Sequence, residues 1–385
     1  MAERVLVAPD KFKGSLPAAE VAARVAAGLR RAGFGGEIVQ MPVADGGEGT
    51  VDAAVSAGFR RVELGVRGPT GRPVTAAFGV LDGTAVIEAA QACGLSRLPE
   101  GSPAPLTATS RGVGELILVA TRMGVKRIVL GLGGVATTDG GAGLVQALGA
   151  RLTDGAGYDL GPGGAALARL GTLELSRLRD LSGVEFLLAS DVDNPLLGPS
   201  GAAAVYAPQK GASPDEVRLL AAGLERWADV AEETVAARRP DRPSPVGVVR
   251  HSPGAGAAGG IGFAALLFLG AQMRPGIELL LEMLTFGRQL DGARLVITGE
   301  GSLDGQTLHG KAPVGVARAA AAHDPAVPVV AVSGVRALSP GDLREAGIAA
   351  AYALTDIEPD VSRCIANAGP LVERLAERIA DDWLR

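Results

Sequence analysis

The chain has 385 residues, of which 47% are hydrophobic, 21% charged and 3% aromatic, and its formal net charge at pH 7 is −5. This length exceeds what one hydrophobic core usually supports, so we expect two domains. An acidic chain with so few aromatic side chains has neither the basic surface nor the stacking platforms of a nucleic-acid-binding protein. A nucleic-acid partner is therefore not expected.

The cysteine content and the apolar stretches bear on the cellular compartment. Only Cys93 and Cys364 occur, far apart and without metal-type spacing, so neither a disulfide framework nor a structural zinc site is expected. The first residues lack the apolar core of a secretory leader. The most apolar stretch, 261–273, is too short to span a bilayer and predicts a buried helix. We expect a cytoplasmic protein that does not contact a membrane.

The first sixty residues contain two strand–loop–helix units. Residues 5–8 predict a buried strand, and Ser15 is placed to cap the helix that follows. Residues 38–43 predict a second strand, which leads through ADGGEGT (44–50) into a helix from Val51. This order is typical of a parallel sheet.

From about Gly58 the pattern changes to alternating runs, which predict strands of an antiparallel or mixed sheet at 62–66, 74–80 and 85–89. The other expected helices are 111–123, 215–237, 314–322 and 362–384, and the other expected strands are 127–132, 185–189, 295–298, 327–332 and 349–354. The proline-rich stretch 238–247 predicts an exposed loop. The two chain ends therefore predict one doubly wound domain, with the middle of the chain as an inserted second domain.

One glycine-rich loop has the spacing of a phosphate-binding motif. Residues 305–312 (GQTLHGKA) match G-x-x-x-x-G-K, but Ala312 replaces the hydroxyl residue that holds Mg²⁺ in a P-loop. A true P-loop is therefore not expected. Lys311 still precedes a helix with Pro313 in its first turn, and such a helix start suits a phosphate. A surface turn with a solvated lysine is the alternative.

A second loop, GAGAAG (254–259), matches the G-x-G-x-x-G of dinucleotide-binding folds. The motif needs a firm strand before it, and the preceding VGVVRHSP (246–253) is a poor strand. A glycine-rich turn that lets the backbone approach a ligand is favoured instead. An NAD(P)-dependent oxidoreductase of hydroxy acids and a non-catalytic sugar-acid or nucleotide-binding protein remain as alternative functions.

Acidic residues recur in the glycine-rich loops, and each alone is explained by a helix cap or an Asx-turn. They are Asp10, Asp45, Glu48, Asp139, Asp191, Asp193, Glu300 and Asp304. Together with lysines in the same loops they fit phosphoryl transfer, because metal and ammonium groups neutralise phosphates while a carboxylate orients the acceptor hydroxyl.

Several long stretches, in this order, resemble the bacterial glycerate kinase family. They are APDKFKGSLPAAEVA (8–22), PVADGGEGT (42–50), GLGGVATTDGGAG (131–143), SDVDNPLLGPSGAAAVYAPQKGA (190–212), GAGAAGGIG (254–262) and LVITGEGSLDGQTLHGKAPVGVA (295–317). The chain departs from the family pattern at Lys11, Val135, Thr138 and Ser302. The change at Ser302 removes an arginine that is common in the family.

The resemblance implies an α/β protein of two domains with the active site in the cleft between them. A flavodoxin-like doubly wound parallel-sheet domain would comprise residues 1–60 and 290–385, and an inserted mixed α/β domain residues 61–289. It implies transfer of a phosphoryl group from Mg-ATP to D-glycerate, giving ADP and 2-phosphoglycerate, with 3-phosphoglycerate less favoured. We expect Mg²⁺ as cofactor and a monomer or homodimer.

Site roles are assigned on the positions that match the family. Asp191 is the expected acceptor of the glycerate hydroxyl proton, Asp45 and Asp193 the Mg²⁺ ligands, and Lys13 and Lys311 contacts of phosphate or carboxylate. The remaining expected substrate- or nucleotide-binding residues are Asp10, Gly46, Gly47, Gly133, Gly134, Thr137, Asn194, Gln209, Lys210, Gly256, Gly259, Glu300 and Asp304.

Overall fold

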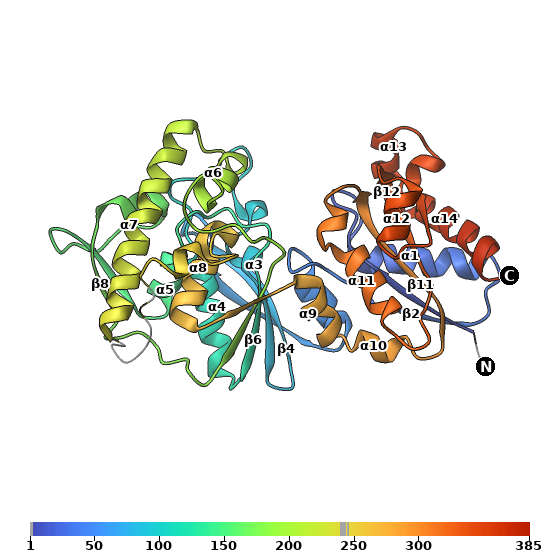
Figure 1. The fold of residues 1–385 in the computed structure, drawn as a ribbon, viewed down its shortest axis with the longest axis horizontal. Helices are drawn as coiled ribbons and strands as arrows, with labels where there is room; N and C mark the ends of the chain where they lie inside the picture. The colour runs from blue at the N-terminus through green and yellow to red at the C-terminus, as the bar shows by residue number, and fades with distance from the viewer. Residues whose placement is uncertain (1–2, 239–243, 245) are drawn as a thin grey trace. The chain divides into compact units, whose positions relative to one another are not determined.

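The computed structural model describes residues 3–238, 244 and 246–385, so most of the loop expected at 238–247 lies outside the described residues. The chain divides into two compact units (Figure 1). Unit 1 comprises Met1–Phe59 and Pro275–Arg385, and unit 2 comprises Arg60–Arg274. Among the described residues, no helix has both the length and the apolar character needed to cross a membrane.

Unit 1 is built on a five-stranded parallel sheet with the order β13-β12-β11-β1-β2. Its strands are β1 (Arg4–Pro9), β2 (Glu37–Gln40), β11 (Ala293–Leu303), β12 (Val329–Arg336) and β13 (Ala350–Ala353). Counted along the chain within the unit, the order is 2-1-3-4-5, which is the flavodoxin-like order. In such sheets ligands bind at the carboxyl ends of the strands where the order reverses, here between β1 and β11.

Helices cover both faces of this sheet. They are α1 (Ala18–Arg31), α2 (Thr50–Ser56), α9 (Gly276–Met283), α10 (Phe286–Gln289), α11 (Ala312–Ala321), α12 (Pro340–Glu345), α13 (Val361–Ala366) and α14 (Ala368–Trp383). Val5 and Val7 of β1 face a core formed with α1 and α14, whereas Leu6 and Ala8 face a core formed with α9 and α11. This alternation confirms the doubly wound fold class, because successive strand residues point to opposite faces.

The second segment of unit 1 begins earlier than the expected residue 290. Residues 275–289 belong to unit 1, although we expected them in the inserted domain. Ile277, Leu280, Leu284 and Phe286 are buried in the same core as β11 and α11. Their apolar spacing was compatible with either domain, since it shows only that one helix face is buried.

Two helix ends in unit 1 differ from the sequence expectation. Helix α1 starts at Ala18 after Pro17, and the Ser15 hydroxyl donates to the Phe12 carbonyl instead of capping the helix. The last helix is two helices, α13 and α14, which meet at Asn367 with φ −120° and ψ 28°. A continuous apolar period does not reveal such a break.

Unit 2 contains a six-stranded mixed sheet with the order β10-β9-β6-β5-β4-β3 and a separate hairpin of β7 and β8. The strands are β3 (Arg60–Arg67), β4 (Pro73–Leu81), β5 (Thr84–Glu88), β6 (Arg127–Gly131), β7 (Arg151–Asp154), β8 (Leu170–Glu174), β9 (Glu185–Ala189) and β10 (Gln272–Arg274). Strands β3, β4 and β5 pair antiparallel, and β5, β6, β9 and β10 pair parallel.

The helices of unit 2 share one large core with this sheet. They are α3 (Ala89–Cys93), α4 (Arg111–Arg122), α5 (Ala142–Ala147), α6 (Ala202–Tyr206), α7 (Pro214–Arg238) and α8 (Ala257–Leu269). The apolar stretch 261–273 begins as the expected buried helix but ends in the short strand β10. Three residues are too few for a periodicity to identify a strand.

Candidate functional site

In unit 1, Asp10 follows the last residue of β1, at the reversal point of the sheet. Its backbone N–H donates to the Gly299 carbonyl on β11 at 2.7 Å. The carboxylate accepts a hydrogen bond from the Lys11 N–H at 2.6 Å and lies 3.6 Å from the Lys11 ammonium. The same ammonium donates to the Glu48 carbonyl at 2.8 Å, so Lys11 joins the loop after β1 to the loop after β2.

The loop after β2 contributes Asp45, Gly46 and Gly47. The Gly47 N–H donates to the Asp45 carboxylate at 3.1 Å, and the Thr50 hydroxyl at the start of α2 donates to the Gly47 carbonyl at 2.7 Å. Gly46 has φ +90°, which only glycine adopts without strain. The backbone also passes very close to α9, because a Cβ on Gly276 would lie 1.9 Å from the Asp45 carbonyl oxygen.

The third part of the unit 1 site comes from β11, which extends to Leu303 and so places Glu300 in the strand rather than in a loop. The Thr307 hydroxyl donates to the Glu300 carboxylate at 2.5 Å, and the Lys311 ammonium lies 3.6 Å from it. Asp304 accepts from the Gln306 N–H at 2.9 Å and from the Ser302 hydroxyl at 3.2 Å. Lys311 is the N-cap of α11, as expected for an ammonium at a helix start.

Negative charge accumulates at this edge of the sheet. Burial raises the pKa of Asp10 from 3.8 to about 7; Lys11 lowers it, and Asp45 and Glu300 raise it further. The pKa of Glu300 is also raised, chiefly by burial, against the opposing effects of Thr307 and Lys311. Burial lowers the pKa of the Lys11 ammonium, but Asp10, Asp45 and Glu48 outweigh it, and the net shift is upward. The unit 1 site thus carries carboxylates that would be stabilised by an additional cation.

The structure brings together all the unit 1 residues of the expected site except one. Lys13 is exposed, and within the described part of the chain its side chain makes no hydrogen bond or ion pair. Its backbone is near β11, since a Cβ on Gly301 would lie 3.0 Å from the Lys13 nitrogen. Lys11, which is not among the expected site residues, contacts the Asp10 carboxylate, and Lys311 contacts that of Glu300.

In unit 2, side chains from other elements form hydrogen bonds with the turn 131–143, which lies between β6 and α5. Asp139 is buried and accepts hydrogen bonds from the Ser110 N–H and hydroxyl, both at 2.8 Å, and from the Gly141 N–H at 3.1 Å. Burial raises its pKa, and these hydrogen bonds oppose the rise. The Trp227 indole N–H donates to the Gly140 carbonyl at 2.9 Å. Asp139 therefore has a structural role in fixing this turn.

Lys210 lies beneath the same turn. Its ammonium is buried and donates to the Thr137 carbonyl at 2.6 Å. Burial lowers its pKa to about 8, although Cys93 and Asp139 act in the opposite direction. The hydroxyl oxygens of Thr137 and Thr138 are buried and, within the described residues, have no hydrogen-bond partner. Lys210 is thus a buried support of the turn rather than an exposed cation.

The glycine-rich stretch at the start of α8 packs directly on this turn. Ala258, Gly259 and Gly260 all have left-handed φ values, from +53° to +93°. A Cβ on Gly259 would lie 1.9 Å from the Thr137 carbonyl oxygen, and the Gly140 N–H donates to the Gly259 carbonyl at 3.0 Å. The 3₁₀ turn Val249–His251, rather than a strand, precedes the stretch, so it lacks the context of a dinucleotide-binding fingerprint.

The loop after β9 completes the unit 2 site. The Gly256 N–H donates to the Asn194 carbonyl at 2.9 Å, and the Tyr206 hydroxyl donates to the Asn194 side-chain oxygen at 2.5 Å. Asp191 and Asp193 are both exposed on this loop. Burial raises the pKa of Tyr206, and the Asp193 charge adds to the rise.

Three expected residues of unit 2 have few contacts. Gln209 is exposed in the turn Pro208–Lys210. Gly134 has φ +72°, and its carbonyl accepts from the Leu95 N–H at 2.9 Å, while the neighbouring Gly133 is partly exposed. Gly133 and Gly134 therefore present accessible backbone at the carboxyl end of β6.

Sequence reasoning missed residues that act on the site from outside the glycine-rich motifs. Ser110 and Trp227 lie on other elements, and only the fold brings them to the turn 131–143. Thr307 lies within the G-x-x-x-x-G-K stretch, so its hydroxyl could have been noted. No group of three or more histidine, cysteine, aspartate or glutamate side chains in the described ranges is arranged to hold a metal ion by itself.

The chain is similar to a known protein family, to named glycerate kinases and to a solved structure. The profile of the Glycerate kinase family matches residues 5–384. The chain is 43% identical to a glycerate kinase of Bacillus subtilis over 381 residues (98% of this chain, 97% of the relative). It is 42% identical to the glycerate 2-kinase of Escherichia coli over 356 residues (91% and 90%). A crystal structure assigned to glycerate kinase 2 of Salmonella typhimurium LT2 matches with a TM-score of 0.80 at 39% identity, covering 100% of both chains.

Proposed function

The chain belongs to the glycerate kinase family and is a kinase, and from this premise we propose that it transfers the γ-phosphoryl group of Mg-ATP to the 2-hydroxyl of D-glycerate. The products are ADP and 2-phosphoglycerate. The observation that carries the proposal is the full-length match to relatives, one of which is named a glycerate 2-kinase. The cluster of carboxylates and lysines at the reversal point of the unit 1 sheet supports it independently.

The donor set of unit 1 fits Mg²⁺. Asp10, Asp45 and Glu300 offer hard carboxylate oxygens whose mutual repulsion a divalent cation would relieve. One or two of these carboxylates are enough for Mg²⁺, because this ion is usually bound together with waters and substrate phosphates. When bound, Mg²⁺ supplies neutralisation of phosphate charge during transfer. Asp45 is the proposed ligand in unit 1, and Asp193 is the separate candidate in unit 2.

The lysines and helix starts of this chain would bind and orient the anionic groups. Lys311 at the N-cap of α11 provides an ammonium at the positive end of the helix dipole, a combination that favours phosphate. Lys13 is exposed, so it is free to contact phosphate or the glycerate carboxylate. Lys11 holds Asp10 and the loop at Glu48 in place.

In unit 2, the turn 131–143 and the stretch 254–260 would cradle nucleotide or substrate through backbone N–H groups. Gly133 and Gly134 provide the accessible backbone, while Lys210, Trp227 and Gly259 hold it in position. A cradle fixed in this way binds the charge of the transition state without reorganising, which is how electrostatic catalysis lowers a barrier.

Two carboxylates are candidates for accepting the glycerate hydroxyl proton. Asp191, the residue expected from the sequence, is exposed at the end of β9. Asp10 is buried directly after β1, at the reversal point of the sheet where ligands bind, and burial raises its pKa in the absence of a cation. Replacing the true base by asparagine lowers kcat by about 100-fold or more. A loss below about tenfold in a folded variant would remove that residue from the role.

The product is tested with a coupled assay. Enolase converts 2-phosphoglycerate directly to phosphoenolpyruvate, so the proposal predicts phosphoenolpyruvate from ATP, D-glycerate, Mg²⁺ and enolase alone. If phosphoenolpyruvate appeared only after phosphoglycerate mutase was added, the product would be 3-phosphoglycerate. We also propose a cytoplasmic monomer or homodimer, which light scattering of the purified protein distinguishes from larger assemblies.

A further inference from the structure

Ser333 lies at the carboxyl end of β12, in one row with two carboxylates of the unit 1 site. It is the Cα partner of Glu300 on the neighbouring strand β11. Asp10 follows β1 on the other side of β11, and its N–H donates to the Gly299 carbonyl, so it lies at the same level. Three adjacent strands therefore bring Asp10, Glu300 and Ser333 to one edge of the sheet.

The side chains of Glu300 and Ser333 point to the same face of this sheet, because strand residues two or four positions apart share a face. Val296, four positions before Glu300, is buried in the core formed with α9 and α11. Val329 and Ala331, four and two positions before Ser333, are buried in the same core. Adjacent strands lie about 4.8 Å apart, so the Ser333 hydroxyl and the Glu300 carboxylate are close neighbours.

The Ser333 hydroxyl is buried without a hydrogen bond. The residue has no exposed surface, and within the described residues its hydroxyl oxygen has no hydrogen-bond partner. Thr298, one level lower on β11, is buried as completely, but its hydroxyl donates to the Ala8 carbonyl at 2.9 Å. A buried hydroxyl without a partner destabilises the folded state, and a functional role in another state of the site explains such a group.

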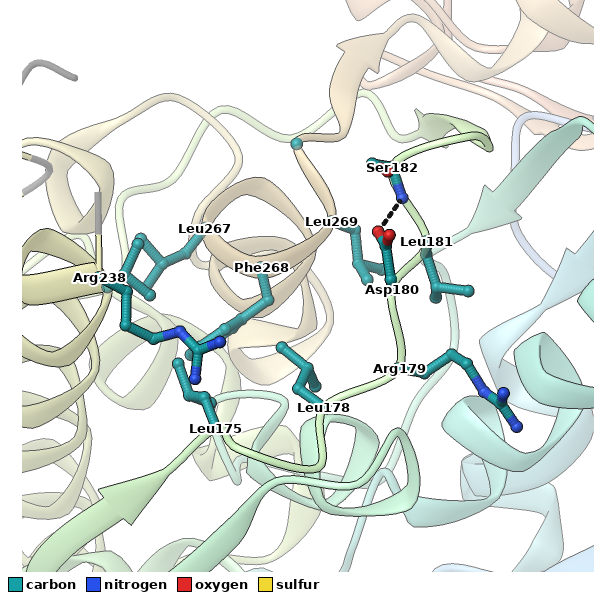
Figure 2. Close-up of a pocket in the computed structure, with 12 residues that line it drawn as sticks. Leu175, Leu178, Arg179, Asp180, Leu181, Ser182, Arg238, Leu267, Phe268 and Leu269 are labelled. Carbon is teal, nitrogen blue, oxygen red and sulfur yellow. Dashed lines mark hydrogen bonds between the residues drawn. The ribbon is translucent and has the colours of Figure 1, made fainter. Parts of the chain in front are cut away.

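The hollow at the ends of α7 and α8 in unit 2 shows the more usual arrangement of polar groups (Figure 2). It has a volume of about 520 Å³ and is lined by residues 175, 178–182, 235, 238 and 267–270. Asp180 in its wall accepts a hydrogen bond from the Ser182 N–H at 3.0 Å, the dashed line in Figure 2. No buried polar side-chain atom of this lining lacks a partner within the described residues, so the hollow gives no comparable sign of a function.

The Glu300 carboxylate is held by the segment that follows β11. The Thr307 hydroxyl donates to it at 2.5 Å, and the Lys311 ammonium lies 3.6 Å from it. If Lys311 binds phosphate, its attraction to Glu300 weakens, and a buried carboxylate then needs another donor. Ser333 is the hydroxyl on the neighbouring strand, and a hydroxyl proton rotates to suit an acceptor.

We propose that Ser333 is a positioning residue of the unit 1 site, whose hydroxyl donates to the Glu300 carboxylate when the Lys311 ammonium binds phosphate. The inference rests on the proposed function, since it needs a phosphate at Lys311. The hydrogen bond would keep Glu300 in place while Mg-ATP is bound, without contact between Ser333 and the substrate.

The Ser333→Ala variant tests this role through binding as well as through turnover. Calorimetric titration with Mg-ATP, without D-glycerate, should give a Kd at least about tenfold above that of the parent, as is usual when the partner of a ligand-holding side chain is removed. The KM for ATP should rise by the same order, while kcat changes by less than about threefold. Because the hydroxyl has no partner before phosphate binds, the melting temperature without nucleotide should be equal to the parent's or up to about 4 °C higher.

Thr298→Val is the matched control, because it removes a buried hydroxyl that already has its partner. Its melting temperature should fall by about 2–4 °C, while its Kd for Mg-ATP stays within about twofold of the parent's. A Glu300→Gln background tests the link to Glu300. A hydrogen bond to a neutral acceptor has roughly half the strength of one to a carboxylate, so Ser333→Ala should raise the Kd only about threefold in this background.

A Kd for Mg-ATP that is unchanged by Ser333→Ala, or raised equally by Thr298→Val, would overturn the proposal. An effect of Ser333→Ala that is just as large in the Glu300→Gln background would also overturn it, because the hydroxyl would then not act through that carboxylate. A nucleotide-free melting temperature well below the parent's would assign the Ser333 hydroxyl a structural role instead. A parent protein that bound no Mg-ATP would count against the proposed function itself, and the role of Ser333 would fall with it.

Discussion

Replacing Gly259 by alanine tests whether the turn 131–143 depends on close backbone packing. Gly259 has φ +64°, and its new Cβ would lie 1.9 Å from the Thr137 carbonyl oxygen. Real Cβ atoms do not approach closer than 3.0 Å, so the two segments must separate by about 1 Å. The separation would disturb the hydrogen bonds of Lys210 to Thr137 and of Gly140 to Gly259.

The expected magnitude has two parts. A left-handed alanine costs roughly 1–2 kcal/mol, and overpacking a tight contact costs about 1–3 kcal/mol more. Because a displacement of about 1 Å in a positioning element can lower activity about 100-fold, kcat/KM should fall by that order. Calorimetric unfolding and the ADP-release assay measure the two effects.

Gly270→Ala is the matched control. Gly270 has nearly the same backbone conformation, φ +63°, but nothing lies within 4 Å of its Cβ position. It should show the dihedral cost alone and keep near-normal kcat/KM. If the two variants had equal stability and equal activity, the argument that Gly259 sets the position of the turn would be wrong.

Three further predictions concern charged groups of the site. Because burial raises the pKa of Asp10 to about 7, the folded protein without metal or nucleotide should lose stability as the pH rises from 4 to 7. The Asp10→Asn variant should not show this loss. In thermal unfolding the variant should be equal to the parent at pH 4 and more stable than the parent at pH 8 by up to about 4 kcal/mol. Lys210→Met removes the hydrogen-bond donor of the Thr137 carbonyl but also removes a buried charge, so the free energy of unfolding should change by less than about 2 kcal/mol. Because the turn is then less well positioned, kcat/KM should fall at least about tenfold. A large loss of stability with normal kinetics of the folded fraction would argue against a positioning role. Lys311→Met should lower kcat/KM for ATP about 100-fold. The control Lys126→Met, at an exposed lysine, should leave kcat/KM unchanged in the same assay. If both variants changed kcat/KM equally, the role of Lys311 would be contradicted.

Much of the fold follows from local patterns in the sequence. The strand Glu185–Ala189 and the helix beginning at Arg111 are recognisable from apolar periodicity alone, because their buried faces are continuous. The final helix was predicted as one element because nothing in its apolar period marks the break at Asn367. Residues 275–289 were given to the wrong unit because periodicity shows that a face is buried without showing against what.

Glycine-rich motifs indicate candidate site residues from the sequence, whereas residues that depend on tertiary contacts leave no such signal. Asp10, Asp45 and Glu300 stood out because they follow or end strands of a parallel sheet. The burial of Lys210 and the support from Trp227 could not be predicted, because both contacts join residues more than 70 positions apart.

The central claim is tested most directly by the rate of ADP release from ATP by the purified protein, measured with and without D-glycerate and with and without Mg²⁺. The account predicts release that requires both and that is lost when Mg²⁺ is chelated. Release that is independent of D-glycerate, or no release from folded protein supplied with both, would contradict it.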